Sequence, residues 1–540
     1  MAASSRRHFL ATTSGAALAV AIGGVGRARA DQAPVRGGTL SIILQPEPVT
    51  LTPATNVAQP TQVVAGNIFD GLVTYDFELN PRPHLAERWE VAPDGLAITF
   101  FLRKGVTWHD GQPFTSADVK WSLENIWKTI HPRNKALFAN VSNVETPDAT
   151  TIVLTFSKPS LPIFSVINGV GAPILPKHLY EGTDILNNPY NNKPVGTGPF
   201  VFKEWKKGEY VLLERNPAYW DAGRPYLDKL VFRVIPDAAT RAAAIEKGEI
   251  QYAPFNPVPF RDVERLAALP GLKVETRGYE WLSPLFYLDF NVDSATLKDV
   301  RVRRAIAHAV DRDALAKIVW FGYAKAAISP VPSTLTAFFD ADVPRYPFNP
   351  KKAEALLDEA GFKRGADGVR FTITHDFLPY GDDYRHTGEF LKQALKRVGI
   401  EVTIRSQDSA SFINRVYAER DFDTASSYNA AFPDPQIGVV REYWSGWLGT
   451  KTPWTNGSGY RNPEVDALIQ DAAVQGSAPA RIADFKKFQQ IVQTDLPTLP
   501  LLELKFFTIH AANLRGVVEQ GDQVYSSLGH AWFDDAPKRI

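Results

Sequence analysis

Cysteine is absent from the 540-residue chain, and methionine occurs only at position 1. The lack of cysteine excludes disulfides, thiolate metal sites, cysteine nucleophiles and a lipid-modified N-terminal cysteine. No stretch reaches the ~20 apolar residues that a membrane-spanning helix requires. The 59 Lys and Arg residues are balanced by 59 Asp and Glu residues, so we expect neither nucleic acid nor an anionic membrane as a partner.

Catalytic motifs are also missing. None of the ten histidines lies in H-E-x-x-H or another zinc-ligand spacing, and no serine lies in G-x-S-x-G. The adjacent carboxylates Asp382/Asp383 and Asp534/Asp535 fall in loop-like contexts, where neighbouring side chains usually diverge. We therefore predict no metal held by protein ligands, no cofactor and no catalytic residues, with a hydrolase as the alternative.

The first 30 residues read as a targeting segment. Ser5-Arg6-Arg7-His8-Phe9-Leu10 matches the twin-arginine pattern, and a mildly apolar stretch leads to Ala28-Arg29-Ala30, a small-x-small cleavage site. The segment carries four arginines and no acid, so its removal leaves a net charge of −4. We expect a twin-arginine signal peptide over residues 1–30 and a mature protein that is free in the periplasm without a lipid anchor.

The stretch from His84 to Trp127 predicts a hairpin followed by a helix. AERWEV and LAITFFLRKGV flank Pro93-Asp94-Gly95, where Asp-Gly supplies the positive φ values of a tight turn. Thr115 and Asp118 have the spacing of a capping box, which places a helix start there. The same pattern occurs in many α/β domains, so it fixes structure rather than function.

Strand and helix patterns alternate along the whole chain, which predicts an α/β fold of interleaved lobes. The glycines of Gly196-Thr197-Gly198 lead into a strand rather than a helix, so we interpret them as a tight turn and not as a phosphate loop. Strands are expected at 36–44, 230–236, 272–276, 285–290, 371–377, 400–405 and 499–509, and a strand pair at 144–156 around Thr146-Pro147-Asp148. Helices are expected at 61–69, 240–246, 299–320, 350–360, 383–398 and 481–493, with another opening at 462–463.

Aromatic residues gather around predicted turns in the second half of the chain. Flat side chains offer contact area at low entropic cost, which suits reversible binding of a small polar solute, although core packing explains more than half of them. The residues are Trp281, Tyr380, Tyr384, Tyr428, Phe432, Tyr443, Trp444, Trp447 and Trp454.

Several segments, in this order, resemble the family 5 extracellular solute-binding proteins, the receptors of ABC importers for peptides, nickel and related solutes. They are NIFDGLVTYDFELNPRPHLAERW, the hairpin block that follows it, PVGTGPFVFKEWKKGEYVLLERNPAYW, DVRVRRAIAHAVDRDALAKIVWFG, NPKKAEALLDEAGF and SGYRNPEVDALIQDA. The resemblance covers nearly the whole of residues 31–540.

The resemblance implies a type II periplasmic-binding fold, α/β throughout, with two main lobes, a smaller inserted lobe and the ligand in the cleft between lobes. Lobe I would comprise residues 31–60, 190–283 and 500–540. The smaller lobe would comprise 61–189 and lobe II 284–499, with hinge strands near 280–290 and 495–505. Solute binding would proceed by lobe closure and break no bond.

In peptide-binding members, an aspartate in the segment that matches 429–435 pairs with the α-ammonium of the peptide. Here that position falls on Ala431, which argues against ordinary peptides with a free N-terminus. Alternatively, Asp376 or Glu280 replaces the anchoring aspartate from another loop. Asp434 matches a position that is structural, in a proline-bracketed turn. Arg385 or Arg415 is a candidate for a ligand carboxylate, or a surface arginine. The expected substrate-binding residues are Trp281, Asp376, Tyr380, Arg385, Tyr428, Asn429, Ala431 and Phe432.

The implied partners are a peptide or peptide-like small solute and the permease subunits of an ABC importer, with the receptor acting as a monomer. A receptor for a nickel chelate or an opine-type solute is the alternative within the family, and a periplasmic hydrolase is the alternative outside it. Residue spacing does not identify the solute, because specificity depends on loop geometry.

Overall fold

The predicted alternation of strands and helices runs through residues 33–534, the part of the chain that the computed structural model describes. The expected signal peptide, residues 1–30, lies outside this part. The elements below all belong to one unit, Val35–Ile540. Among the described residues, no helix combines the length and apolarity needed to cross a bilayer.

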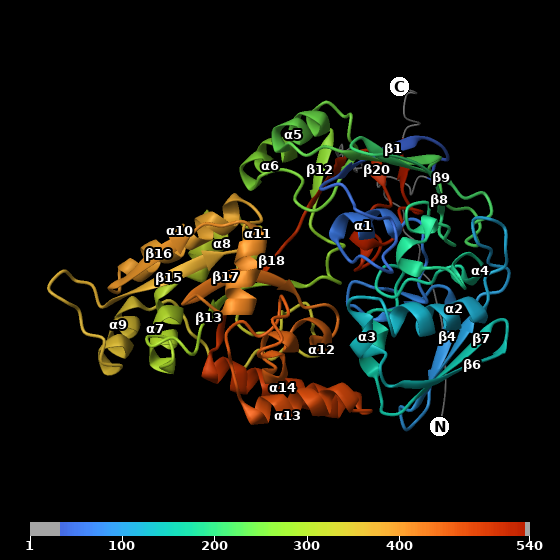
Figure 1. The fold of residues 1–540 in the computed structure, drawn as a ribbon. Helices are drawn as coiled ribbons and strands as arrows, with labels where there is room; N and C mark the ends of the chain where they lie inside the picture. Colours follow the sequence, from blue (N-terminus) through green and yellow to red (C-terminus); the bar gives the residue numbers. More distant parts are fainter. Residues whose placement is uncertain (1–32, 535–540) are drawn as a thin grey trace, which may run out of the picture. The chain divides into compact units, whose positions relative to one another are not determined.

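A seven-stranded mixed sheet, in the order β12-β19-β11-β1-β10-β9-β8, combines strands from both ends of the chain (Figure 1). Strand β1 pairs in parallel with β10 and β11, and the other pairs are antiparallel. Its elements are β1 (Thr39–Leu44), β8 (Phe200–Lys206), β9 (Tyr210–Arg215), β10 (Lys229–Val234), β11 (Tyr252–Ala253), β12 (Leu272–Glu275) and β19 (Thr508–Ala511), with helices α1 (Gln59–Ala65), α5 (Ala238–Glu246) and α6 (Phe260–Ala267).

A separate four-stranded sheet, β4-β5-β7-β6, contains the predicted hairpin. The capping box is present, because the Thr115 N–H donates to Asp118 Oδ2 at 2.9 Å at the start of α2. The elements are β4 (Ala86–Val91), β5 (Ala97–Leu102), β6 (Val141–Asp148), β7 (Thr151–Phe156), α2 (Ser116–Ser122), α3 (Asn134–Leu137) and α4 (Lys177–Tyr180), with the ribbon β2 (Val73–Tyr75) and β3 (Pro81–Pro83) beside them.

Segments that are distant in sequence meet at Asp70, a residue that is 4% exposed. Its carboxylate lies 3.0 Å from His84 Nε2 and accepts hydrogen bonds from Trp220 Nε1 at 2.8 Å, Thr197 Oγ1 at 3.3 Å and Tyr219 OH at 3.4 Å. Burial raises the pKa of this carboxyl, but His84 and the hydrogen bonds outweigh burial, so the pKa lies below its usual value. One buried carboxylate thus joins the segments around positions 70, 84, 197 and 220.

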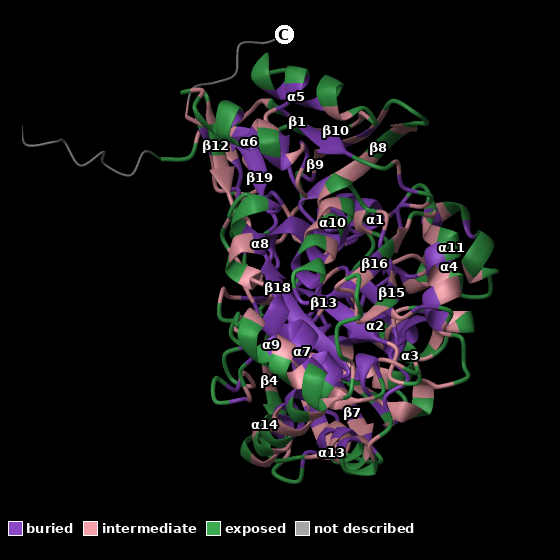
Figure 2. Ribbon diagram, turned by 90° about the vertical axis from the view of Figure 1, so that its left-hand side faces the viewer, coloured by how far each residue is buried: buried purple, intermediate pink, exposed green. Residues whose placement is uncertain are grey.

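A six-stranded sheet, β14-β18-β13-β17-β15-β16, is built from the second half of the chain. Its central strands β13 and β18 are buried along their whole length (Figure 2). Strands β15 and β16 are parallel, as their β-α-β order predicts. The strands are β13 (Pro284–Phe290), β14 (Ala324–Ala326), β15 (Phe371–Phe377), β16 (Ile400–Arg405), β17 (Thr424–Ala430) and β18 (Thr498–Leu504).

The helices around this sheet are α7 (Val300–Ala309), α8 (Arg312–Ile318), α9 (Pro350–Glu359), α10 (Asp382–Lys396), α11 (Ser409–Ile413), α12 (Pro435–Gly438), α13 (Pro463–Val474) and α14 (Ala478–Asp495). Helix α7 packs on α9, and α13 on α14 (Figure 1). A last ribbon pairs β20 (Leu514–Arg515) with β21 (Trp532–Phe533). Short 3-10 or π-helical turns occupy Leu123–Trp127, Leu161–Ser165, Ile185–Asn187, Pro189–Asn191, Asn414–Glu419, Val440–Glu442, Ser445–Trp447 and Gln523–Tyr525.

Two predicted elements are each divided in the structure. The helical region 299–320 is two helices, because Val310 leaves helical backbone geometry and Asp311 caps α8 by accepting from the Ala314 N–H at 3.0 Å. The strand expected at 499–509 is β18 and β19, which belong to different sheets. A continuous apolar run does not reveal where a chain leaves one sheet for another.

The chain therefore crosses between the seven-stranded and six-stranded sheets at two places after β12. The first crossing is 276–283, between β12 and β13, and the second is 505–507, between β18 and β19. These crossings lie at the edges of the strands that the family resemblance marked as hinges, 280–290 and 495–505.

His375 in β15 gives a pH-dependent prediction. Its ring is 1% exposed and is hydrogen-bonded to Thr424 Oγ1 and Ser426 Oγ, and burial lowers its pKa from 6.5 to about 3. Its contribution to stability is complete above the unfolded pKa and is lost as the pH falls from 6.5 towards 3. We expect His375→Gln to remove a slope of about 1.4 kcal/mol per pH unit, measured by denaturant unfolding at pH 6, 5 and 4. An unchanged slope would contradict this assignment.

Candidate functional site

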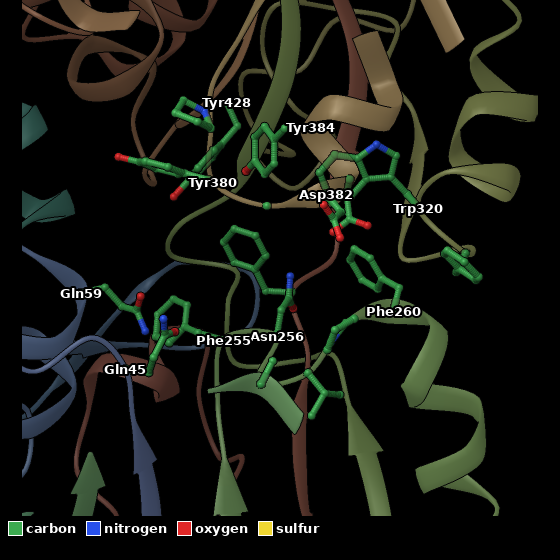
Figure 3. A pocket seen from close by; sticks show the side chains of 18 of the residues that line it. Gln45, Gln59, Phe255, Asn256, Phe260, Trp320, Tyr380, Asp382, Tyr384 and Tyr428 are labelled. Carbon is green, nitrogen blue, oxygen red and sulfur yellow. The ribbon is translucent and has the colours of Figure 1, made fainter. Parts of the chain in front are cut away.

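A cavity of about 1110 Å³ is lined by both large sheets and both crossings (Figure 3). The seven-stranded side supplies the residues that follow β1 and β11 and the starts of α1, α5 and α6. The six-stranded side supplies the end of α8, the turn from β15 into α10, and β17. Leu282 and Phe506 line it from the two crossings. A volume of this size accommodates a small molecule or a short peptide.

Aromatic rings form the wall on the six-stranded side. We name Tyr380, Tyr384 and Tyr428 the tyrosine cluster, since their ring centroids lie 6.2–6.4 Å from one another. Trp320 packs on Tyr384 at 5.6 Å and fixes its position. None of the three hydroxyls has a hydrogen-bond partner among residues 33–534, and all three residues line the cavity. The cluster therefore combines apolar contact area with free hydroxyl groups.

The opposite wall carries neutral polar groups. Gln45, Gln59 and Asn256 lie there beside Phe255 (Figure 3). Phe255 and Asn256 both have left-handed backbone conformations, with φ of 59° and 50°, which costs energy for residues other than glycine. Such strain persists only where surrounding structure holds it in place.

Hydrogen bonds to the two crossings hold this turn. The Phe255 N–H donates to Tyr279 OH at 2.9 Å, in the crossing 276–283. Asn256 exchanges two hydrogen bonds with Phe507, in the crossing 505–507: its N–H donates to the carbonyl at 3.0 Å, and its Oδ1 accepts from the Phe507 N–H at 2.9 Å. The cavity wall is thus attached directly to the segments that join the sheets.

Charge in the cavity is concentrated at the start of α10. Asp382 and Asp383 both line the cavity, and Asp382 lies 3.6 Å from Arg385. No cation among the described residues lies within ion-pair distance of Asp383, and burial, with the Asp382 charge, raises its pKa to about 6. The buried cation Arg241 donates to the carbonyls of Ile235, Pro236 and Pro257 and is already satisfied.

Of the predicted substrate-binding residues, Tyr380 and Tyr428 line the cavity, and Asn429, Ala431 and Phe432 do not. Because β17 continues to Ala430, successive side chains point to opposite faces: Tyr428 and Ala430 face the cavity, while Asn429 faces away and contacts Tyr287 OH at 3.1 Å. Ala431 is 2% exposed. The strand register thus divides the predicted segment between the cavity and the interior.

Asp376, Arg385 and Trp281 are also away from the cavity lining. The Asp376 carboxylate is fully buried and already paired with Arg405 at 2.6 Å and Arg415 at 3.3 Å. Arg385 is exposed and pairs with Glu389 at 2.6 Å. Trp281 is 1% exposed, with its Nε1–H donating to the Ser165 carbonyl at 2.9 Å. Asp376 is therefore not free to replace an anchor at position 431, and Glu280 does not line the cavity either. Arg385, the candidate for a ligand carboxylate, is already paired outside the cavity lining.

Asp434 has a structural environment, in agreement with its proline-bracketed sequence. It caps α12 by accepting from the Gln436 N–H at 2.9 Å. Its two oxygens also accept from the two terminal nitrogens of Arg481, both at 2.5 Å, and both side chains are at most 6% exposed. This bidentate pair fixes the chain that follows β17.

Several cavity residues have no distinguishing sequence signal. Gln45 and Pro46 belong to a proline-rich run, which predicts only that the chain crosses a surface or a cleft. Asp382 and Asp383 form an adjacent acid pair, which does not by itself indicate a cavity. Gln59, the pair Asn256 and Phe260, and Trp320 come from three separate segments and meet only through the fold. Contacts between distant segments are what a single sequence does not show.

The two large β-sheets are connected by short crossings, and residues of both sheets' surroundings line the cavity described above. This arrangement is typical of a binding protein. The chain belongs to the bacterial extracellular solute-binding proteins of family 5, whose family model (family 5 Middle) matches residues 80–448. The glutathione-binding protein GsiB of Salmonella choleraesuis is 28% identical over 501 residues, covering 88% of this chain and 90% of that protein.

Solved structures show the same fold. DppA from Helicobacter pylori, in complex with the peptide STSA, is 27% identical with a TM-score of 0.76, over 93% of this chain and 99% of that one. NikZ from Campylobacter jejuni, in complex with Ni(L-His), is 26% identical with a TM-score of 0.76, over 91% and 96%. The expected type II periplasmic-binding fold and the family assignment are thus confirmed.

Proposed function

We propose that this protein is the periplasmic substrate-binding component of an ABC importer and captures a peptide or peptide-like small solute. The observation that carries the proposal is the cavity of about 1110 Å³ that is lined by both sheets and both crossings. Relatives that bind glutathione and the peptide STSA support this class of solute. The protein would act as a monomeric receptor that delivers its solute to the permease and catalyses no reaction.

Closure around the solute follows from this arrangement. A solute in the cavity contacts walls from both sheets at once, so its contacts favour the closed conformation over the open one. The three-residue crossing 505–507 and the longer crossing 276–283 would act as the hinges. We propose lobes with the boundaries expected from the sequence: 31–60, 190–283 and 500–540; 61–189; and 284–499. Export by the twin-arginine segment and release into the periplasm complete the proposal.

The test is to express the full 540-residue chain, purify it without refolding, and examine it by native mass spectrometry. Glutathione and the peptide STSA are then titrated by calorimetry. We expect a retained small molecule or saturable one-to-one binding, with the retained molecule unmodified. Hydrolysed products in the bound fraction would favour the hydrolase, and neither a retained nor a titratable solute would contradict the proposal.

A nickel chelate is the second ligand class to include, because NikZ was solved with Ni(L-His). Among the described residues, no group of three or more His, Asp or Glu side chains is arranged to hold a metal ion. A nickel ion would therefore have to arrive with its own chelator, and the same titrations with nickel in the presence and absence of L-histidine distinguish this class from peptides.

Tyr428 provides a direct test of the cavity. Its ring contacts Tyr380, Tyr384 and Phe506, and its hydroxyl has no partner among the described residues. We expect Tyr428→Ala to weaken binding of the retained solute by about 10- to 100-fold, through lost contact area of about 1.5–3 kcal/mol. Phe348→Ala, at an exposed aromatic that does not line the cavity, is the matched control and should leave the affinity unchanged. Equal affinities for the two variants would place the solute elsewhere.

A further inference from the structure

Of the three acidic side chains that line the cavity, Asp382 and Glu389 pair with Arg385, and Asp383 has no ion-pair partner among the described residues. Asp383 is half-buried in the first turn of α10, lines the cavity, and has no ion-pair partner within the described part of the chain. An aspartate in a first helical turn stabilises the helix, but that role needs only an exposed carboxylate. Partial burial in the cavity wall instead removes water from the carboxylate, which is unfavourable unless a cation arrives.

The side chains around Asp383 are suited to a cation. Tyr384 is 7% exposed, and its free hydroxyl belongs to the cavity wall together with those of Tyr380 and Tyr428. Tyrosine rings attract cations through their π faces, and their hydroxyl oxygens accept hydrogen bonds from N–H groups. The opposite wall offers amides and no free carboxylate, so the two ends of the cavity differ in chemistry.

We infer that the solute carries a cationic nitrogen, and that the Asp383 carboxylate and the tyrosine cluster bind this nitrogen at the α10 end of the cavity. The inference rests on the proposed function and adds a charge and an orientation to it. Ala431, the residue after β17, is buried and does not line the cavity, so position 431 offers the solute no anchor and the carboxylate available to a cation is that of Asp383 on α10.

Arg261 on α6 provides the competing explanation. It also lines the cavity, its side chain is 70% exposed, and its closest acid is Asp262 at 4.0 Å. Closure could bring Arg261 to Asp383 as a latch between the two walls. A latch would stabilise the closed form with any solute, whereas an anchor distinguishes a solute with a charged nitrogen from the same solute without it.

The test uses matched pairs of probes: glutathione and N-acetylglutathione, and the peptide STSA and its N-acetylated form. Wild type, Asp383→Asn and Asp313→Asn are titrated by calorimetry at pH 7.5. Asp313 is the control because it is an exposed aspartate in the first turn of α8 and does not line the cavity. Thermal unfolding of each variant establishes that the proteins are equally folded.

We expect the wild type to bind at least one free amine more tightly than its acetylated form by about 10- to 100-fold, the effect of a charged hydrogen bond. Asp383→Asn should abolish this preference, and Asp313→Asn should retain it. Equal weakening of both forms by Asp383→Asn would identify a latch and overturn the inference, as would a preference that survives in Asp383→Asn. A retained solute without a basic nitrogen overturns the inference and leaves the proposed function standing, whereas the absence of any bound solute overturns both.

The pH dependence gives an independent check. The charged groups that face Asp383 are Asp382 and His386 on α10 and Arg261 on α6, and Glu389 is paired with Arg385. Because the pKa of Asp383 is raised to about 6, the preference for the free amine should grow as the pH rises from 5 to 7.5. A preference that falls over this range would contradict the assignment to a carboxylate.

Discussion

Replacing Asp70 by alanine is expected to lower the free energy of unfolding by about 3–5 kcal/mol, the range for breaking a buried charged network from one side. The change leaves His84 Nε2 and Trp220 Nε1 without their acceptor in a buried site. It also removes the side chain that joins the segments around positions 70, 84, 197 and 220. Denaturant unfolding of wild type and Asp70→Ala measures the effect.

Asp110→Ala is the matched control for this experiment. The His178–Asp110 pair has the same chemistry at 2.6 Å, but the two side chains are 35% and 31% exposed, so its loss should cost about 1 kcal/mol or less. Since the folded pKa of Asp70 lies below its usual value, its contribution is present above the unfolded pKa and is lost as the pH falls through the folded pKa. The difference between wild type and Asp70→Ala should therefore narrow in acid, and a constant difference would contradict the ion-pair account.

Arg481→Met should have an effect of similar size, about 3–5 kcal/mol, because it leaves the Asp434 carboxylate buried without its partner. The arginine also donates to the Ala472 carbonyl at 2.8 Å and packs against Phe485, so it joins α12, α13 and α14. The free energy of unfolding from denaturant titration measures the loss.

A double-mutant cycle separates the pair from the packing. Asp434→Asn combined with Arg481→Met removes both charges, and we expect it to be less destabilising than the sum of the single changes. Arg385→Met, which breaks the exposed pair with Glu389, should cost about 1 kcal/mol or less. Additive single changes in the cycle would show that the two side chains act independently.

Much of the fold could be predicted because local signals coincide with element boundaries. Asn349 and Asn462 cap α9 and α13, each followed by proline, and β15 and β16 have the bounds that their alternation indicates. Prediction was wrong where the deciding event is tertiary. The run 499–509 changes sheet at residues 505–507, and no local property of Lys505, Phe506 or Phe507 marks that change.

The site was less predictable than the fold for the same reason. Clustering of aromatic residues near turns indicated Tyr380 and Tyr428, which line the cavity, but strand register decides that Tyr428 faces the cavity and Asn429 does not. Asp376 has the charge expected of a ligand contact, and only the structure shows that Arg405 and Arg415 already neutralise it. Charge and residue type indicate what a side chain can do, and spatial neighbours determine what it does.

The strained turn at Phe255 and Asn256 connects the cavity to the two crossings, so it is the place where a bound solute would alter the geometry of the proposed hinges. Both residues touch the cavity, and both are hydrogen-bonded to the segments about which the walls would rotate. A compound that binds in the cavity without contacting this turn would not change the conformation of the crossings 276–283 and 505–507. Under the proposed closure, occupancy and transport competence would be separate properties, and a tight-binding inhibitor of uptake would be a molecule that achieves the first without the second.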